Sequence, residues 1–172
     1  MTAARSKDFF DWVRVWAVAV MLAAGVAAIV GSALEWVTIT VRPELRQDTL
    51  FDAGNEPEEP EMTKPFTGLA ARDGWWSLAG GVILIAAALL LLVRQRARWG
   101  WLGVIGAVLI GAVAIADYRG IGNLSSNISR RLNIVGEAEP GIGLTLVVAA
   151  ALIGLIGSVA GIAASPPRRN DH

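Results

Sequence analysis

The sequence predicts an all-α membrane protein, a bundle of four transmembrane helices with a small β-containing first outer loop and a short amphipathic outer helix. Two observations predict this class. Of the 172 residues, 54% are hydrophobic and only 17% are charged, whereas an average globular chain has about 25% charged residues. The charges are also unevenly spread, because several long stretches contain none. Uncharged apolar stretches of this length are typical of membrane spans.

Four apolar runs are long enough to cross a bilayer. A helix rises about 1.5 Å per residue, so about 20 residues cover a hydrocarbon core of about 30 Å. Backbone amides cannot stay unpaired in lipid, so the runs must be helices. We expect spans at residues 13–34, 75–93, 99–116 and 142–164. Arg14 lies near the start of the first span, and we expect its side chain to reach back to the lipid headgroups.

The first run has a cleaved signal peptide as its alternative. A signal peptide has a basic start and an apolar core of about 7–15 residues. Here the apolar run is longer, and Asp8 and Asp11 interrupt the basic start. We therefore predict a retained span.

The basic residues predict the direction of the spans. Residues 94–98 hold three arginines, the first 14 residues hold three basic residues, and the tail at 165–172 adds two arginines. The positive-inside rule then places both termini and the 94–98 link in the cytoplasm. The loop at 117–140 opposes this assignment, because it also holds three arginines. Abundant Arg, Ala and Gly indicate a bacterial source, so we expect a multi-pass protein of the plasma (inner) membrane.

The tryptophans are expected to mark the two membrane boundaries, where an indole buries its ring and keeps its N–H in water. Trp36, Trp75 and Trp76 would form the outer belt, and Trp12, Trp16, Trp99 and Trp101 the inner one. Trp75 and Trp76 are neighbours on a helix, so we expect one to face lipid and the other the bundle. A ligand or partner site at this pair is the alternative.

The first outer loop, residues 35–74, is expected to contain a β-hairpin. Residues 36–41 alternate with period two and are β-branched, and a second segment near residues 62–69 would pair with them. Between them, the acidic and proline-rich residues 52–61 predict a flexible tip. Cation binding by this tip is the alternative, although the ligand spacing of an EF-hand is missing.

The second outer loop, residues 117–140, is expected to form the short amphipathic helix. Its apolar residues recur at three- and four-residue steps: Ile121, Leu124, Ile128, Leu132 and Val135. That spacing places them on one helix face, which would lie on the membrane surface or cap the bundle.

Charged and aromatic residues at the outer membrane edge make up the candidate site. We expect Asp73 to cap the second span, and Asp117 or Glu35 to pair with Arg119 or Arg72 if the helix ends meet. A structural ion pair and a ligand-binding site are the two interpretations. The candidate ligand or partner site consists of Glu35, Trp36, Asp73, Trp75, Trp76, Asp117 and Arg119.

Small residues recur at four-residue spacing in the last two spans. They are Gly103, Ala107 and Gly111, and Gly157 and Gly161. Such stripes let helix backbones approach closely. Packing within the chain and docking onto another membrane protein both remain open.

The chain lacks the residues that several kinds of catalysis and ligand binding require. Cysteine is absent and His172 is the only histidine, so thiolate catalysis, haem ligation by histidine and a catalytic triad are excluded. The chain has no phosphate-binding GxxxxGK[ST] motif and no carboxylate deep in a span. Its net charge is zero, so we expect no nucleic-acid partner. We predict no catalytic residue, no cofactor and no metal site, and hence no enzyme.

Three segments resemble the small, uncharacterised four-span membrane proteins of actinobacteria: GSALEWVTI at the end of the first span, FTGLAARDGWW before the second, and PGIGLTL at the fourth. The resemblance covers most of the chain but implies no activity. The plan is also similar to that of claudins. Because this chain lacks their cysteine pair and their Gly-Leu-Trp run, that likeness implies architecture only.

From these features we expect a non-catalytic accessory or scaffolding subunit of a larger bacterial inner-membrane complex. Its partners would be membrane lipids and another integral membrane protein or a second copy. The alternative is a protein that binds a lipid or other hydrophobic ligand at the outer interface.

Overall fold

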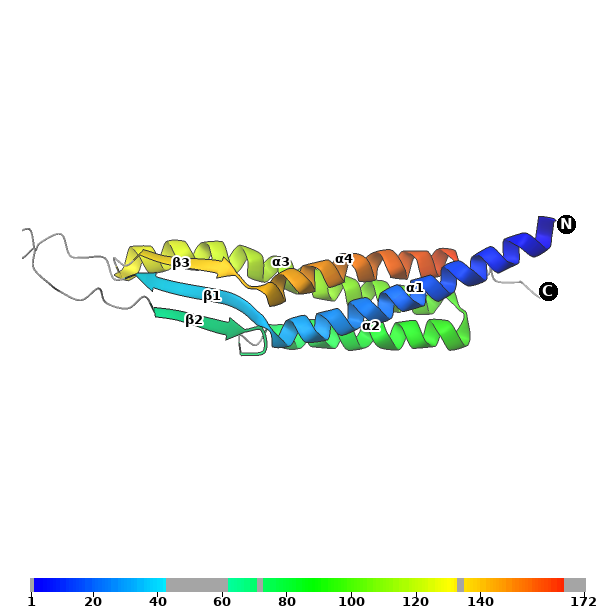
Figure 1. The fold of residues 1–172 in the computed structure, drawn as a ribbon, viewed down its shortest axis with the longest axis horizontal. Helices are drawn as coiled ribbons and strands as arrows, with labels where there is room; N and C mark the ends of the chain where they lie inside the picture. Colours follow the sequence, from blue (N-terminus) through cyan, green and yellow to red (C-terminus); the bar gives the residue numbers. More distant parts are fainter. Residues whose placement is uncertain (1, 43–61, 71–72, 133–134, 166–172) are drawn as a thin grey trace, which may run out of the picture.

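The computed structural model describes residues 2–42, 62–70, 73–132 and 135–165 (Figure 1). In chain order the elements are α1 (Thr2–Ala33), β1 (Glu35–Arg42), β2 (Met62–Thr67), α2 (Gly74–Arg94), α3 (Ala97–Leu132), β3 (Val135–Pro140) and α4 (Ile142–Ala163). The acidic run at 52–61 and the tail after Ser165 lie outside the described residues.

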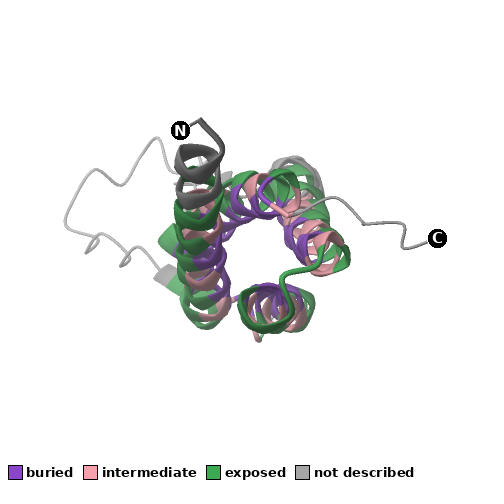
Figure 2. Ribbon diagram, turned by 90° about the vertical axis from the view of Figure 1, so that its right-hand side faces the viewer, coloured by how far each residue is buried: buried purple, intermediate pink, exposed green. Residues whose placement is uncertain are grey.

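The four helices form a ring in which α1 and α3 each pack against both α2 and α4. Seen from the end, their buried residues face the middle of the ring (Figure 2). Met21, Leu84, Ile110 and Val147 are fully buried there, one from each helix. This apolar centre is the core of the bundle.

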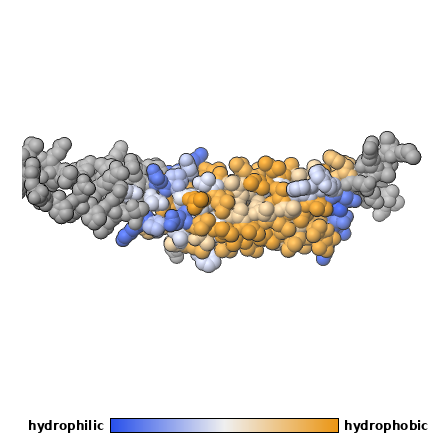
Figure 3. Space-filling model, in the orientation of Figure 1, coloured by the Kyte–Doolittle hydropathy of each residue, from blue (hydrophilic) through white to orange (hydrophobic). Residues whose placement is uncertain are grey.

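The outer faces of the helices are apolar as well. An orange belt of hydrophobic side chains covers the bundle, and polar residues gather at its two ends (Figure 3). Helices that are apolar on all sides belong in lipid. The segments long and apolar enough to cross a membrane are Phe9–Ala33, Gly74–Arg94, Ala97–Ile121 and Ile142–Ala163. The predicted four-helix membrane bundle is therefore confirmed.

A three-stranded antiparallel sheet extends the bundle at one end, with strand order β2-β1-β3. In the middle strand, Val37 is paired with Phe66 of β2 on one side and with Pro140 of β3 on the other. The predicted pairing of the two segments in the first outer loop is confirmed. The third strand was not predicted.

The segment after the third span differs from the prediction. Residues 117–132 form no separate helix, because α3 continues without interruption to Leu132 and packs against β3. No proline interrupts this stretch, and the isolated Gly120 and Gly122 cost a helix only about 1 kcal/mol each. Val135, expected on the same helix face, instead begins β3. Pro140 ends that strand at the edge of the sheet, where a missing backbone N–H is tolerated.

Candidate functional site

Trp36 lies at the start of β1, between the sheet and the bundle. It is only 2% exposed, and its indole N–H donates a 2.7 Å hydrogen bond to the carbonyl oxygen of Gly31. The ring packs on Gly68 and lies close to Gly143, where a Cβ atom would collide with it. The prediction that Trp36 anchors the protein as part of the outer tryptophan belt is therefore wrong. The apolar ring is buried, and the indole N–H has a hydrogen-bond acceptor, inside the protein.

Backbone hydrogen bonds join the three helix–strand connections around this tryptophan. The amide of Gly68 donates to Leu34, that of Leu69 donates to Ser32, and that of Gly141 donates to Trp36. The last bond is 2.7 Å long. We call Ser32, Trp36, Gly68, Gly141 and Gly143 the outer junction. Because it joins α1, β2 and α4 through β1, it fixes the sheet relative to the helices.

Glu35 takes part in the outer junction through its backbone. Its carbonyl oxygen lies too close to Gly141 and Gly143 for either residue to carry a Cβ atom. The two backbone segments can approach this closely only because residues 141 and 143 are glycines.

Trp75 and Trp76 both face outward, and each is 61% exposed. The expectation that one would face the bundle is wrong. The inward face of α2 is made by Gly74, Ser77 and the residues that follow at helical spacing, so positions 75 and 76 both fall on the other side.

Asp73 occupies the cap position of α2, but its side chain makes no capping hydrogen bond. Its carboxyl lies beside that of Asp117 on α3, close enough for the two to interact. The Oδ2 atom of Asp117 is buried and has no hydrogen-bond partner among the described residues. The structure thus brings two of the predicted acidic residues together, which the sequence could not show.

The expected ion pairs at this edge are not formed by the described residues. Arg119 is exposed, and in the described ranges the one ion pair is that between Asp11 and Arg14 at the opposite end. Arg72 lies outside the described residues. Nor does the described part of the chain hold a group of three or more His, Cys, Asp or Glu side chains able to bind a metal.

The small residues of the last two spans face other helices of the same chain. A Cβ atom on Gly157 would lie 3.0 Å from Met21, and one on Gly161 would lie 2.5 Å from Leu91. One on Gly103 would lie 2.5 Å from the Oγ atom of Ser158. Ala107 is buried, and Gly111 faces Ala151. The structure thus shows packing within the chain for all five positions.

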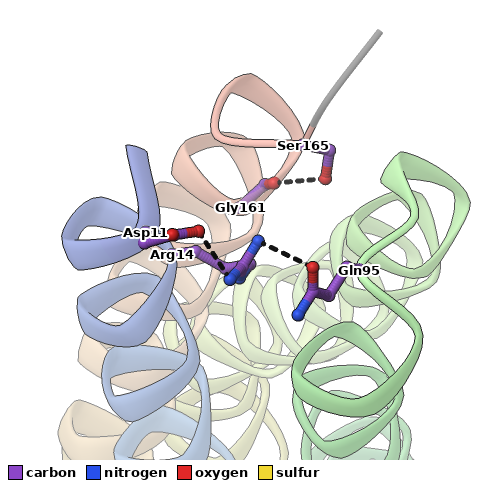
Figure 4. Close-up of polar contacts among 5 residues, drawn as sticks. All are labelled: Asp11, Arg14, Gln95, Gly161 and Ser165. Atoms are coloured by element: carbon purple, nitrogen blue, oxygen red, sulfur yellow. Dashed lines mark hydrogen bonds and ion pairs between the residues drawn. The ribbon is translucent and has the colours of Figure 1, made fainter. Parts of the chain in front are cut away.

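The end of the bundle opposite the sheet holds a polar contact that sequence reasoning missed. The side chain of Arg14, which we expected to reach back to the lipid headgroups, is only 12% exposed. It donates a 2.8 Å hydrogen bond to Asp11 and a 3.3 Å hydrogen bond to the side chain of Gln95, in the turn between α2 and α3 (Figure 4). Gln95 adopts a left-handed conformation with φ of 50°, which reverses the chain. No residue type in this turn signals that geometry.

The inner tryptophans differ in burial. Trp12, Trp16 and Trp101 are exposed, as predicted for an aromatic belt. Trp99 is half-buried against the core, and the guanidinium of Arg98 lies 4.7 Å from the centre of its ring.

Comparison with known proteins adds no family to these observations. No protein-family model matches the chain, and no curated protein matches it. The resemblance to actinobacterial four-span proteins therefore stays a prediction, and any function has to be argued from the geometry.

Proposed function

We propose that this protein is a non-catalytic accessory or scaffolding subunit of a larger bacterial inner-membrane complex, and that it binds its partner through the outer sheet. The observation that carries the proposal is the outer junction. Trp36 and the backbone bonds around it give the sheet a fixed position on four membrane-spanning helices. A pre-organised surface loses little conformational entropy on binding.

The surface that we assign to the partner is the edge of β2 with which no other described strand pairs. The strand order leaves β2 at one side of the sheet, while β3, on the other side, packs against α3. Lys64, Pro65 and Phe66 are exposed along β2, and Phe66 is 42% exposed. An edge strand offers unpaired backbone groups, and an exposed aromatic ring is a frequent anchor in protein interfaces.

The predicted direction of the spans indicates which kind of partner the sheet would meet. With both termini in the cytoplasm, the sheet stands outside the cytoplasm, at the end of the bundle opposite Arg14. The partner would then be an integral membrane protein with an outer domain, or a second copy of this chain.

Site-specific photo-crosslinking in native membranes tests the proposal. A photoreactive phenylalanine analogue at Phe66 should form an adduct with a protein. The same analogue at Leu152, which is 60% exposed on the apolar side of α4, should react with lipid only. Mass spectrometry identifies both adducts. The proposal fails if position 66 gives no protein adduct, or if both positions give the same one.

A second candidate function rests on the Asp73–Asp117 pair. Trp75 and Trp76, two and three residues after Asp73, are exposed, and Asp117 has a buried oxygen that no described residue hydrogen-bonds. Together they offer an apolar surface beside a polar group, as a lipid or other amphiphilic ligand requires. Asp117→Asn and Trp76→Ala should then reduce the lipid that co-purifies with the protein and leave the crosslink at position 66 intact. Unchanged lipid content in both variants would remove this candidate.

A further inference from the structure

The turn between α2 and α3 concentrates positive charge at the inner end of the bundle. Arg94, Arg96 and Arg98 are all exposed there. Residues 74–116, which surround them in the sequence, contain no Asp or Glu. Asp11, the nearby acid on α1, already accepts a hydrogen bond from Arg14. The charge of the three arginines is therefore not balanced within this turn.

The turn is also held in place. Arg14 of α1 donates to the side chain of Gln95, which lies between Arg94 and Arg96. The guanidinium of Arg98 lies over the ring of Trp99, and this cation–π contact favours one position of the side chain. A guanidinium held in this way keeps N–H groups free at its edge, and these match the oxygens of a phosphate in a bidentate arrangement.

Apolar surface adjoins these arginines on both helices. Val93, next to Arg94, is 75% exposed, and Trp101, three residues after Arg98 and on the same side of α3, is 61% exposed. A soluble anion has no apolar part that could pack against this surface. A lipid would place its phosphate on the arginines and its acyl chains along the apolar side chains.

We propose that the turn formed by Arg94, Arg96 and Arg98, with Val93 and Trp101 beside it, is a binding site for an anionic phospholipid. The site lies at the opposite end of the bundle from the β2 edge, so it does not depend on the proposed partner. A cluster of arginines at a helix–membrane boundary attracts acidic headgroups, with each arginine strengthening binding about fivefold.

Native mass spectrometry of the full chain in a mild detergent tests the site. The probes are phosphatidylglycerol and phosphatidylcholine with identical acyl chains. We expect the wild type to retain phosphatidylglycerol in preference to phosphatidylcholine, and added salt to weaken this preference. The double variant R96Q/R98Q should bind phosphatidylglycerol about 30-fold more weakly.

Two further variants separate the site from total charge. K64Q/R119Q removes two exposed positive charges near the sheet and should bind phosphatidylglycerol as the wild type does. R96K/R98K keeps the charge but loses the paired N–H groups of the guanidinium, so its affinity should lie between those of the wild type and R96Q/R98Q.

Three results would overturn the proposal. The first is equal retention of the two lipids by the wild type, and the second is an equal loss in R96Q/R98Q and K64Q/R119Q. The third is displacement of phosphatidylglycerol by inorganic phosphate at the same concentration, which would indicate a site for the free anion.

Discussion

Single residues show how differently one residue type is used in this protein. Trp36 is the one buried tryptophan, while Trp75 and Trp76 are exposed at the same end of the bundle. The difference comes from neighbours, because Gly68 and Gly143 leave room for the ring of Trp36 and the carbonyl of Gly31 accepts its N–H. Trp36 thus belongs to the folded core, and the exposed tryptophans contact the surroundings.

Replacement of Trp36 by alanine should therefore destabilise the protein strongly. Loss of a fully buried aromatic side chain costs about 3–5 kcal/mol. Trp76→Ala is the matched control, and it should change the free energy of unfolding by no more than about 0.5 kcal/mol. Thermal unfolding in detergent, followed by circular dichroism, measures both. Similar melting temperatures for the two variants would show that the outer junction contributes little to stability.

The helices approach one another at positions without side chains. A Cβ atom on Gly81 of α2 would lie 2.8 Å from the carbonyl oxygen of Gly25 on α1. One on Gly31 of α1 would lie 3.0 Å from the carbonyl oxygen of Gly143 on α4. These contacts are with backbone, so the neighbouring helix would have to move to admit a methyl group. Close backbone contact gives dispersion attraction where lipid offers no hydrophobic drive.

A pair of glycine-to-alanine variants tests this packing. Gly81→Ala should destabilise the bundle by about 1–3 kcal/mol, because an overpacked contact forces a backbone shift. Gly111→Ala is the control, since its Cβ atom would lie at an ordinary 3.6 Å from the Cβ of Ala151. That change should be neutral or stabilise the helix by about 0.5–1 kcal/mol. Urea or thermal unfolding in the same detergent compares the two, and a destabilised Gly111→Ala variant would contradict the spacing between Gly111 and Ala151.

Over the whole molecule, the two ends of the bundle differ in structure and charge. One end has the sheet and the extended part of α3, and the other has the arginine-rich turn and the Arg14–Gln95 contact. Partner and lipid are assigned to these opposite ends. Neither assignment requires a particular orientation of the protein in the membrane. The orientation decides only on which side of the membrane the partner lies.

The orientation can be measured with single cysteines, because the chain has none of its own. With the termini in the cytoplasm, a cysteine at Lys64 should react with a membrane-impermeant maleimide in cells whose inner membrane is intact. A cysteine at Arg96 should react only after that membrane is permeabilised. The reverse pattern would place the sheet in the cytoplasm and limit the partner to proteins with a domain on that side of the membrane.

The sequence by itself determined the membrane class, the four helices and the pairing of the first two strands. These follow from local properties, namely the length of apolar runs and the period-two alternation of residues 36–41. The sequence could not predict which candidate site residues lie close together, because the distance between Asp73 and Asp117 depends on how α2 and α3 pack. The sequence also placed Trp36 with Trp75 and Trp76, since all lie near the same predicted boundary.

Only the tertiary structure decided which of these residues are buried and which segments pair. Trp36 is buried because its ring lies against Gly68 and Gly143 in the other two helix–strand connections. Arg14 is covered because its side chain contacts Gln95 in the α2–α3 turn. Likewise, α3 continues to Leu132 and Val135 begins a strand because β1 provides an edge with which residues 135–140 pair. The physical reason is the same in each case: burial and pairing depend on partners distant in the chain, whereas hydrophobic length and periodicity are properties of one segment.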